Sequence, residues 1–86
     1  MKELERISEI TSIPIFNLLG RSRKKDISEA RQICVYLLRQ RLTEYETAEI
    51  FGINHSTVNY HYHKIGNYIS IKDKKIMVIL NKYFNE

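Results

Sequence analysis

A run of basic residues is the first part of this sequence that could take part in chemistry. Four cations lie within five residues directly after Gly20, namely Arg21, Arg23, Lys24 and Lys25. Positive charge at this density creates a strong local field, which suits the phosphates of a polyanion. A solvated loop without a partner is an equally good reading, because short basic clusters are common. The basic loop, residues 20–26, therefore needs a second feature to support a binding role.

That second feature is the segment 44–66, whose small and apolar residues have the spacing of a helix-turn-helix. Ala48 is small enough to let two helices cross closely, and Gly52, four residues later, tolerates the positive φ of a tight turn. Val58, six residues further on, is a suitable buried aliphatic on the second helix. An αα-hairpin can share this spacing by chance, so the face that the second helix presents decides between the two readings.

The second helix, expected over residues 54–68, separates into an apolar and a polar face. Helical phase turns Val58, Tyr62 and Ile65 inward. The outward side chains carry hydrogen-bonding groups and no carboxylate: His55, Ser56, Asn59, Tyr60 and His63. A helix in the major groove of DNA needs short polar residues for base edges and no acid that would repel phosphate. The pattern thus favours a DNA-binding helix-turn-helix.

Metal binding and catalysis are disfavoured by the same spacing. His61 and His63 are two residues apart on a helix and point about 200° away from each other, so they cannot share an ion. His55 and Ser56 are adjacent helical residues that diverge, and no acid is in range to orient the imidazole. Cys34 lies on the apolar face of a helix and is expected to be a small buried residue. We expect no metal, no cofactor and no enzymatic activity.

The elements that must position these residues are predicted to be helices. The chain has 86 residues with three glycines and one proline, which favours one small domain, residues 1–86, built from long elements. Apolar residues recur at helical spacing, and no alternating run is long enough for a strand. The fold is therefore predicted to be all-α, a compact six-helix bundle, with helices over residues 2–11, 14–19, 27–42, 44–51, 54–68 and 71–85.

Three of these helices have a predicted N-terminal cap. Asp26 with Glu29, and Thr43 with Glu46, have the spacing of a capping box. Asn54 is a good N-cap for the second helix of the helix-turn-helix. The last helix has an apolar stripe that either completes the core or pairs with a second copy, and core completion is favoured because so small a domain has little other core.

The net charge of +4 comes from the first half of the chain. Residues 1–43 carry nine basic and five acidic side chains, whereas residues 44–86 carry five of each. No apolar run reaches the ~20 residues that span a membrane, and the N-terminus lacks the apolar stretch of a signal peptide. A single Cys excludes a disulfide framework. These features predict a cytoplasmic protein with a polyanionic partner and no membrane partner.

The sequence resembles the C-terminal DNA-binding domain (domain IV) of the bacterial replication initiator DnaA, a member of the Trp-repressor-like superfamily. The resemblance covers roughly residues 7–80. It rests on Asn17-Leu18-Leu19-Gly20-Arg21-Ser22-Arg23, Ala30-Arg31-Gln32, His55-Ser56-Thr57-Val58 and Lys64-Ile65. Together, at these distances, the four motifs are fairly specific, although each alone would be weak.

The resemblance implies that the domain docks on duplex DNA in two places. It places His55, Ser56 and Thr57 against bases and backbone in the major groove, and Arg23 of the basic loop in the adjacent minor groove. It assigns phosphate contacts to Arg31 and Gln32. Our predicted DNA-binding residues are therefore Arg21, Arg23, Lys24, Lys25, Arg31, Gln32, Asn54, His55, Ser56, Thr57, Asn59, Tyr60, His63 and Lys64.

The sequence also departs from that family. The family's ATPase is absent, so origin melting driven by ATP cannot occur in this chain. Gly52-Ile53-Asn54 replaces the usual Gly-Gly-Arg-Asp and shortens the turn, and Glu29-Ala30-Arg31 replaces an Arg-Pro-Arg, which removes one phosphate contact. The fold therefore transfers more safely than the target sequence does.

These observations predict a sequence-specific double-stranded DNA-binding protein, a stand-alone replication- or transcription-related accessory. A domain this small is expected to gain specificity as a homodimer or on adjacent sites. Two alternatives remain open, a protein-interaction module of a replication complex and the DNA-docking domain of a larger enzyme. An acidic face in place of the basic loop would have favoured the protein-interaction module.

Overall fold

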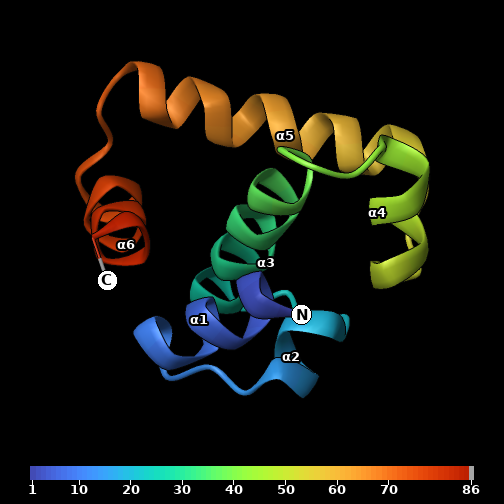
Figure 1. Ribbon diagram of the computed structural model, residues 1–86, viewed down its shortest axis with the longest axis horizontal. Coiled ribbons are helices and arrows are strands. Elements are labelled where there is room, and N and C mark those ends of the chain that lie inside the picture. The colour runs from blue at the N-terminus through green and yellow to red at the C-terminus, as the bar shows by residue number, and fades with distance from the viewer. Residues whose placement is uncertain (86) are drawn as a thin grey trace.

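The computed structural model of the protein describes residues 1–85, which form six α-helices and contain no strand (Figure 1). The predicted all-α fold and six helices are confirmed; Glu86 of the predicted 1–86 domain lies outside the described residues. The helices are α1 (Lys2–Thr11), α2 (Ile15–Leu19), α3 (Lys25–Leu38), α4 (Glu44–Phe51), α5 (His55–Ser70) and α6 (Lys74–Phe84).

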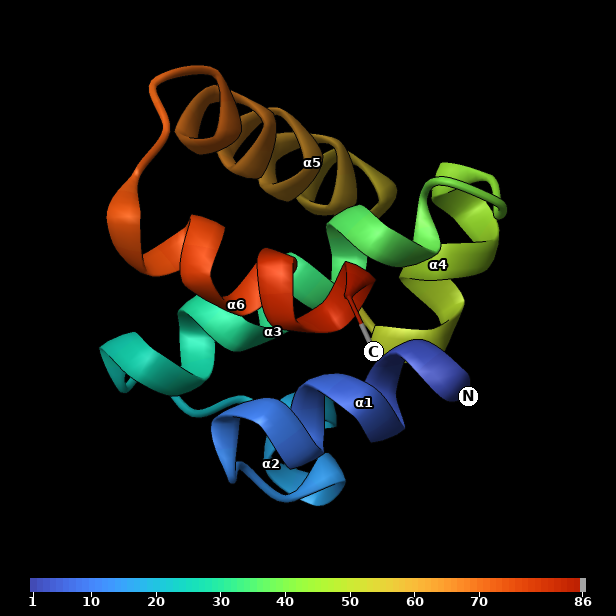
Figure 2. The ribbon, with the colours of Figure 1, turned by 60° about the vertical axis from the view of Figure 1, so that its left-hand side comes forward.

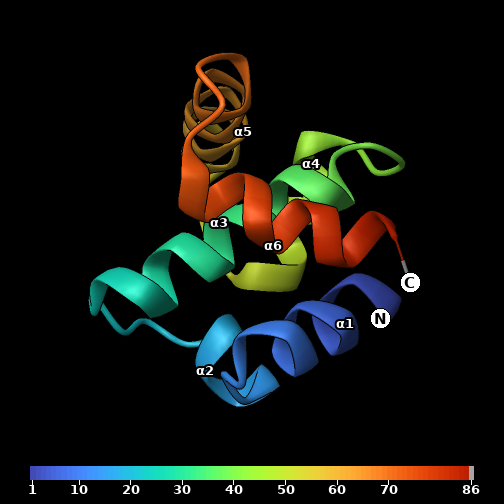
Figure 3. The ribbon, with the colours of Figure 1, turned by 90° about the vertical axis from the view of Figure 1, so that its left-hand side faces the viewer.

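Helix α3 is the centre of the bundle. It packs against α1, α2 and α5, while α5 also packs against α4 and α6, and α6 returns to α1. In Figures 1, 2 and 3, α5 lies across one end of the molecule and α1 and α2 lie at the other, with α3 connecting the two ends. The arrangement measures 28 × 27 × 24 Å, so no helix extends beyond the bundle.

The core is formed by aliphatic side chains from several helices. Ile33 and Leu38 of α3 are fully buried together with Ile7 of α1 and Ile65 of α5. Cys34 lies among them, and burial raises the pKa of its thiol to about 12. The thiol is therefore protonated at neutral pH and serves as a small apolar group, as the sequence predicted.

Two of the three predicted helix caps are present. Thr43 Oγ1 accepts from the backbone N–H of Glu46 at 3.1 Å, and Glu46 Oε1 accepts from the N–H of Thr43 at 2.9 Å, which completes the capping box. Asn54 Oδ1 accepts from the N–H of Ser56 at 2.9 Å and caps α5. These caps hold α4 and α5, the two helices of the helix-turn-helix.

The predicted Asp26–Glu29 capping box is wrong, because α3 begins earlier, at Lys25. Asp26 lies inside the first turn, where its Oδ1 accepts from the N–H of Ile27 at 2.9 Å. Glu29 Oε1 instead accepts from Lys75 Nζ of α6 at 2.7 Å. The Glu29 carboxylate, which local spacing predicted as part of a cap, thus binds Lys75, more than forty residues away in sequence.

The predicted extent of α3 to residue 42 is also wrong, since the helix ends at Leu38. The backbone then tightens into turns in which Gln40 N–H donates to Leu37 O and Arg41 N–H donates to Leu38 O. The side chain of Arg39 donates to Leu42 O at 2.7 Å and closes the turn. The apolar residue at position 42 continues the helical spacing but packs from a turn.

The last helix begins later than predicted, at Lys74, because the backbone reverses just before it. Lys72 has a φ of 56°, which ends the helical path, and Asp73 then caps α6 by accepting from the N–H of Ile76 at 3.1 Å. At α2, Pro14 precedes the helix as its N-cap rather than forming its first residue. No helix within residues 1–85 is long and apolar enough to cross a membrane.

We expect the fold to lose stability in acid through His61 of α5. Burial lowers the pKa of this imidazole below its ordinary value of 6.5, and the nearby charges of Lys64 and Arg31 lower it further. The folded protein therefore binds a proton less readily than the unfolded chain. The stability that depends on neutral His61 is present above the unfolded pKa and is lost as the pH falls through the folded pKa.

Thermal unfolding between about pH 7.5 and pH 5 measures this effect. We expect the midpoint of the wild type to fall more steeply with acidification than that of His61→Gln. His63→Gln, which removes an exposed imidazole two residues further along α5, should keep the wild-type slope. Equal slopes for His61→Gln and the wild type would contradict the assignment.

Candidate nucleic-acid interface

The helix-turn-helix is built from α4, the Gly52 turn and α5. Gly52 has a φ of 63° and its N–H donates to Glu49 O at 3.3 Å, so a residue with a side chain would be strained there. Ala48 and Phe51 of α4 are buried, and so is Val58 of α5. The predicted roles of the small residue, the positive-φ glycine and the buried aliphatic are therefore confirmed.

The first turn of α5 presents polar groups to solvent. Asn54, His55 and Ser56 are exposed, and Thr57 is half-buried. Ser56 Oγ donates to Asn54 Oδ1 at 2.9 Å, so one atom of the Asn54 side chain receives both the capping N–H and this hydroxyl. No acidic residue lies in α5, and the partial positive charge of its N-terminus therefore has no internal anion in the first turn.

The remaining outward residues of α5 lie where helical phase predicted. Asn59, Tyr60 and His63 are exposed, with the Tyr60 side chain 61% accessible. Lys64 is half-buried and its Nζ lies 5.8 Å from the centre of the Tyr60 ring. The Lys64 cation thus lies over the Tyr60 ring on α5, beyond the first turn of the helix.

Tyr62 faces inward, as predicted. Its ring stacks on Tyr36 of α3 with centroids 5.2 Å apart, and the guanidinium of Arg39 lies 5.1 Å from its centre. Val58 and Ile65 are fully buried on the same side of α5. These three side chains fix the rotation of α5 about its own axis, which determines the face that it presents to solvent.

His55 is oriented by a residue that our sequence analysis did not include. Its ring stacks on Tyr45 of α4, with centroids 4.6 Å apart and planes 25° from parallel. Tyr45 is 64% exposed, so this ring pair lies at the surface at the start of α5. An exposed aromatic in the first turn of α4 was visible in the sequence, but its partner ten residues later depends on the angle between the helices.

The basic loop lies beside the helix-turn-helix. Arg21 Nη2 donates to the carbonyl of Gly52 at 3.2 Å, which brings the start of the loop to the turn between α4 and α5. Arg23, Lys24 and Lys25 are exposed. The observed loop is shorter than the predicted 20–26, because α3 begins at Lys25 and includes the last two of these residues.

Arg31 binds the backbone of the segment that leads into the basic loop. Its Nε donates to Leu18 O at 2.9 Å, its Nη1 to Ser22 O at 3.0 Å and its Nη2 to Asn17 O at 3.0 Å. Partial burial lowers the pKa of this guanidinium, which nevertheless stays charged at neutral pH. The three hydrogen bonds fasten the end of α2 and the loop to α3, and the predicted phosphate contact of Arg31 stays a prediction.

Gln32 is buried, with 5% of its surface accessible. Its Nε2 donates to Ser28 Oγ at 3.0 Å, and its Oε1 has no hydrogen-bond partner within residues 1–85. A buried amide has little surface to offer a phosphate. The predicted phosphate contact of Gln32 therefore has no support from its position, and we treat it as a packing residue of α3.

The described residues offer no cluster for a metal ion. Within residues 1–85, no three side chains of His, Cys, Asp or Glu lie close enough together to hold one. The surface around α4, α5 and the basic loop instead combines exposed cations, hydroxyls, amides and aromatic rings. Figure 1 shows α4 and the start of α5 together at the right-hand edge of the molecule. This chemistry suits a nucleic acid.

A helix-turn-helix with an acid-free second helix and an arginine bound to its turn defines a DNA-binding helix-turn-helix domain. Comparison with known families identifies the family within this class. The family described as "Bacterial dnaA protein helix-turn-helix" matches residues 4–65, and the chain belongs to that family. The resemblance noted in the sequence is thereby confirmed.

Two chromosomal replication initiator proteins DnaA are similar to this chain, one from Picosynechococcus sp. and one from Gloeothece citriformis. Each is 39% identical over 82 residues, which is 92% of this chain. The chain spans 18% of the length of either relative. The similarity therefore concerns the helix-turn-helix domain.

We expect Arg31→Ala to destabilise the fold by about 1–3 kcal/mol, because three backbone carbonyls lose their donor. Arg31→Lys should recover only part of this loss, since an ammonium cannot reproduce the planar fork that spans the three oxygens. Urea unfolding followed by circular dichroism measures the free energy of unfolding. Arg23→Ala, which removes an exposed guanidinium from the basic loop, controls for loss of charge.

If Arg31 serves only as a phosphate ligand, its replacement by alanine will leave the unfolding curve unchanged. That result would contradict the fastening role. A loss of DNA affinity that accompanies unchanged stability would assign the residue to the interface instead.

Proposed function

We propose that this protein binds double-stranded DNA with sequence specificity, with the start of α5 in the major groove and the basic loop in the adjacent minor groove. The observation that carries the proposal is the hydrogen bond from Arg21 to the carbonyl of Gly52. It joins the two elements at one place on the surface. A rigid domain can then approach neighbouring grooves of one duplex with both elements at once.

The first turn of α5 supplies the groups for base readout. His55 and Asn59 are exposed and offer donors and acceptors for base edges, while Thr57 has a hydroxyl for phosphate. The α5 N-terminus adds a partial positive charge toward the backbone. The Tyr45 ring limits the directions that His55 can take, so less side-chain entropy is lost when the imidazole meets a base.

The basic loop supplies the electrostatic part of the affinity. Lys24 is the N-cap residue of α3 and Lys25 is its first residue, where the helix dipole disfavours cations. These charges lower the stability of the free helix and gain stabilisation when phosphates approach. Arg23 is exposed in the same loop and suits the negative potential of a narrow minor groove.

We further propose that the protein acts as a replication- or transcription-related accessory. The family assignment supports a link to DnaA-type sites, because the fold of the reading element is shared. The shortened turn, with Asn54 as cap, supports a target that differs from that of typical members. The exposed cations favour DNA as the partner of this surface. If this chain were instead a protein-interaction module, an acidic face would be expected in place of the basic loop.

Binding to a labelled duplex at two salt concentrations tests the proposal. We expect wild-type affinity to fall steeply with salt because phosphate contacts release counterions. Arg23→Ala should cost about 1–3 kcal/mol and reduce the salt slope by about one. His55→Ala should reduce the preference for a site, selected from random duplexes, over an unrelated duplex.

Lys2→Ala is the matched control, since it removes the same charge from α1 rather than from the basic loop. It should change affinity much less than Arg23→Ala. Binding that ignores salt, or equal losses for Lys2→Ala and Arg23→Ala, would contradict the placement of the loop on DNA.

The ring pair gives a separate expectation for site preference. Tyr45→Ala should weaken binding to the selected site by about 0.5–1.5 kcal/mol, the value of an aromatic pair, and leave binding to unrelated duplex nearly unchanged. Tyr45→Phe should retain the stack and the preference. The same duplex titration measures both, and a loss of equal size on the two duplexes would show that Tyr45 does not orient the base-reading imidazole.

A further inference from the structure

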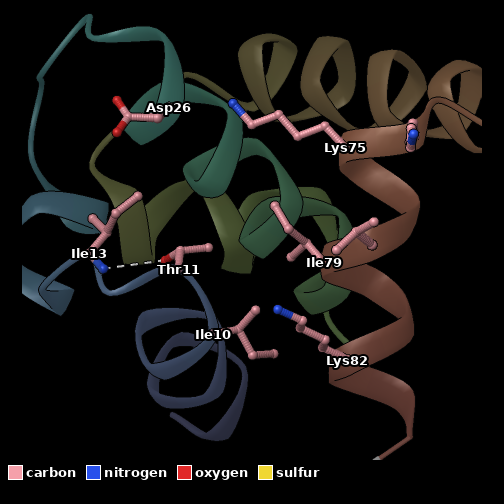
Figure 4. Close-up of a pocket in the computed structure, with 9 residues that line it drawn as sticks. Ile10, Thr11, Ile13, Asp26, Lys75, Ile79 and Lys82 are labelled. Atoms are coloured by element: carbon pink, nitrogen blue, oxygen red, sulfur yellow. Dashed lines mark hydrogen bonds between the residues drawn. The ribbon is translucent and has the colours of Figure 1, made fainter.

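A groove lies between α1 and α6, and one end of it, at Asp26, adjoins the basic loop. Figure 4 shows Ile10 and Thr11 of α1 on one side, Ile79 and Lys82 of α6 on the other, and Asp26 at the start of α3 at one end. The groove has a volume of about 510 Å³ and is open to solvent. In Figure 1, α6 lies at the left of the molecule and α4 at the right, so the groove and the first helix of the helix-turn-helix occupy different sides.

The bottom of the groove is apolar. Ile13 is buried, and Ile10 and Ile79 are partly buried against the core. Val78 also lines the groove and keeps 46% of its surface exposed. Helix α6 thus completes the core with Ile76 and leaves a second apolar strip in solvent, which favours occupation by another apolar surface.

The edges of the groove are cationic. Lys74, Lys75 and Lys82 line it, and no acidic residue lies within α6. Lys75 is neutralised by Glu29 at 2.7 Å, and Asp26 is the one carboxylate among the residues that line the groove. The two other lysines leave an excess of positive charge around the apolar strip, so an occupant is favoured if it brings carboxylates beside its apolar side chains.

We propose that this groove binds an acidic amphipathic helix of another protein. Residues 1–85 contain no strand, so no sheet edge is available for an extended segment, and a helix satisfies its own backbone hydrogen bonds. Apolar side chains on one face of the helix cover Ile10, Val78 and Ile79. Carboxylates on its flanks approach Lys74 and Lys82.

A second copy of this chain is a poorer occupant. Two copies that meet through α6 would bring the same lysines together, and like charges in contact oppose association. An acidic helix has no such conflict. The groove lies on the other side of the molecule from α4, and its Asp26 end adjoins the basic loop. A helix that covers Ile10, Val78 and Ile79 therefore leaves the start of α5 open to DNA, and the protein then couples a partner to a DNA site.

The test uses a synthetic probe peptide of about 14 residues, which spans about 21 Å as a helix. Leucines occupy positions i, i+3, i+4, i+7 and onward, and glutamates occupy the exposed positions. We expect fluorescence anisotropy to show binding of the fluorescein-labelled peptide to the full chain. Val78→Glu, and the pair Lys74→Glu with Lys82→Glu, should each weaken binding by about tenfold or more.

A charge-swapped peptide, with lysine in place of glutamate, should bind the Lys74→Glu, Lys82→Glu variant better than it binds the wild type. Phe16→Glu is the matched control, since Phe16 is 85% exposed on α2 and does not line the groove. This variant should bind the acidic peptide as the wild type does. Circular dichroism of every variant reports that the fold is intact. Duplex binding by the wild type, measured separately, distinguishes a failure here from a failure of the proposed function.

Three results would overturn the proposal. The first is equal affinity of the wild type for the acidic and the lysine-substituted peptides. The second is unchanged binding of the acidic peptide by Val78→Glu. The third is failure of the peptide to bind together with evidence for another occupant of the groove. That evidence would be a dimer in sedimentation equilibrium, or binding to anionic phosphatidylglycerol vesicles, in either case abolished by Val78→Glu.

Discussion

The three hydrogen bonds of the Arg31 guanidinium determine where the charged part of this molecule lies. They join α3 to the carbonyls of Asn17, Leu18 and Ser22 on either side of the end of α2. Without them, the cations that follow would be carried by a segment of five residues between two helices, with much conformational entropy to lose on binding. With them, the loop leaves α2 at a defined point, and Arg21 reaches the Gly52 carbonyl. The partly buried Arg31 thus holds in place the loop that carries the exposed cations.

Packing performs the corresponding task for α5. Val58 and Ile65 are fully buried, and the burial of such side chains stabilises a fold by about 1.5–3 kcal/mol each. Helix propensity contributes much less to the stability of α5 than this burial does, because the segment is rich in β-branched and aromatic residues. The rotation of α5 is therefore set by its apolar face, and the opposite face is free to carry the side chains that suit DNA. The Tyr45–His55 pair adds a local constraint at the end where that face begins.

The two ends of the bundle have different chemistry. The helix-turn-helix side presents hydroxyls, amides, rings and cations, whereas the α1–α6 groove presents an apolar strip between lysines. In Figure 3, α6 lies between α5 and α1, and it packs against both. The family match covers residues 4–65, which include α4 and the first part of α5 and end before α6.

The sequence by itself determined the six helices, the Gly52 turn, the Thr43 and Asn54 caps and the face of α5, because each depends on local spacing and on the conformational range of single residues. Tertiary structure decided the rest. Glu29 accepts a hydrogen bond from Lys75 instead of forming the expected cap, and Arg31 donates to three backbone carbonyls. Gln32 is buried, and the Tyr45 ring stacks on His55. Each of these outcomes depends on how neighbouring helices cross, and helical periodicity carries no information about crossing angles.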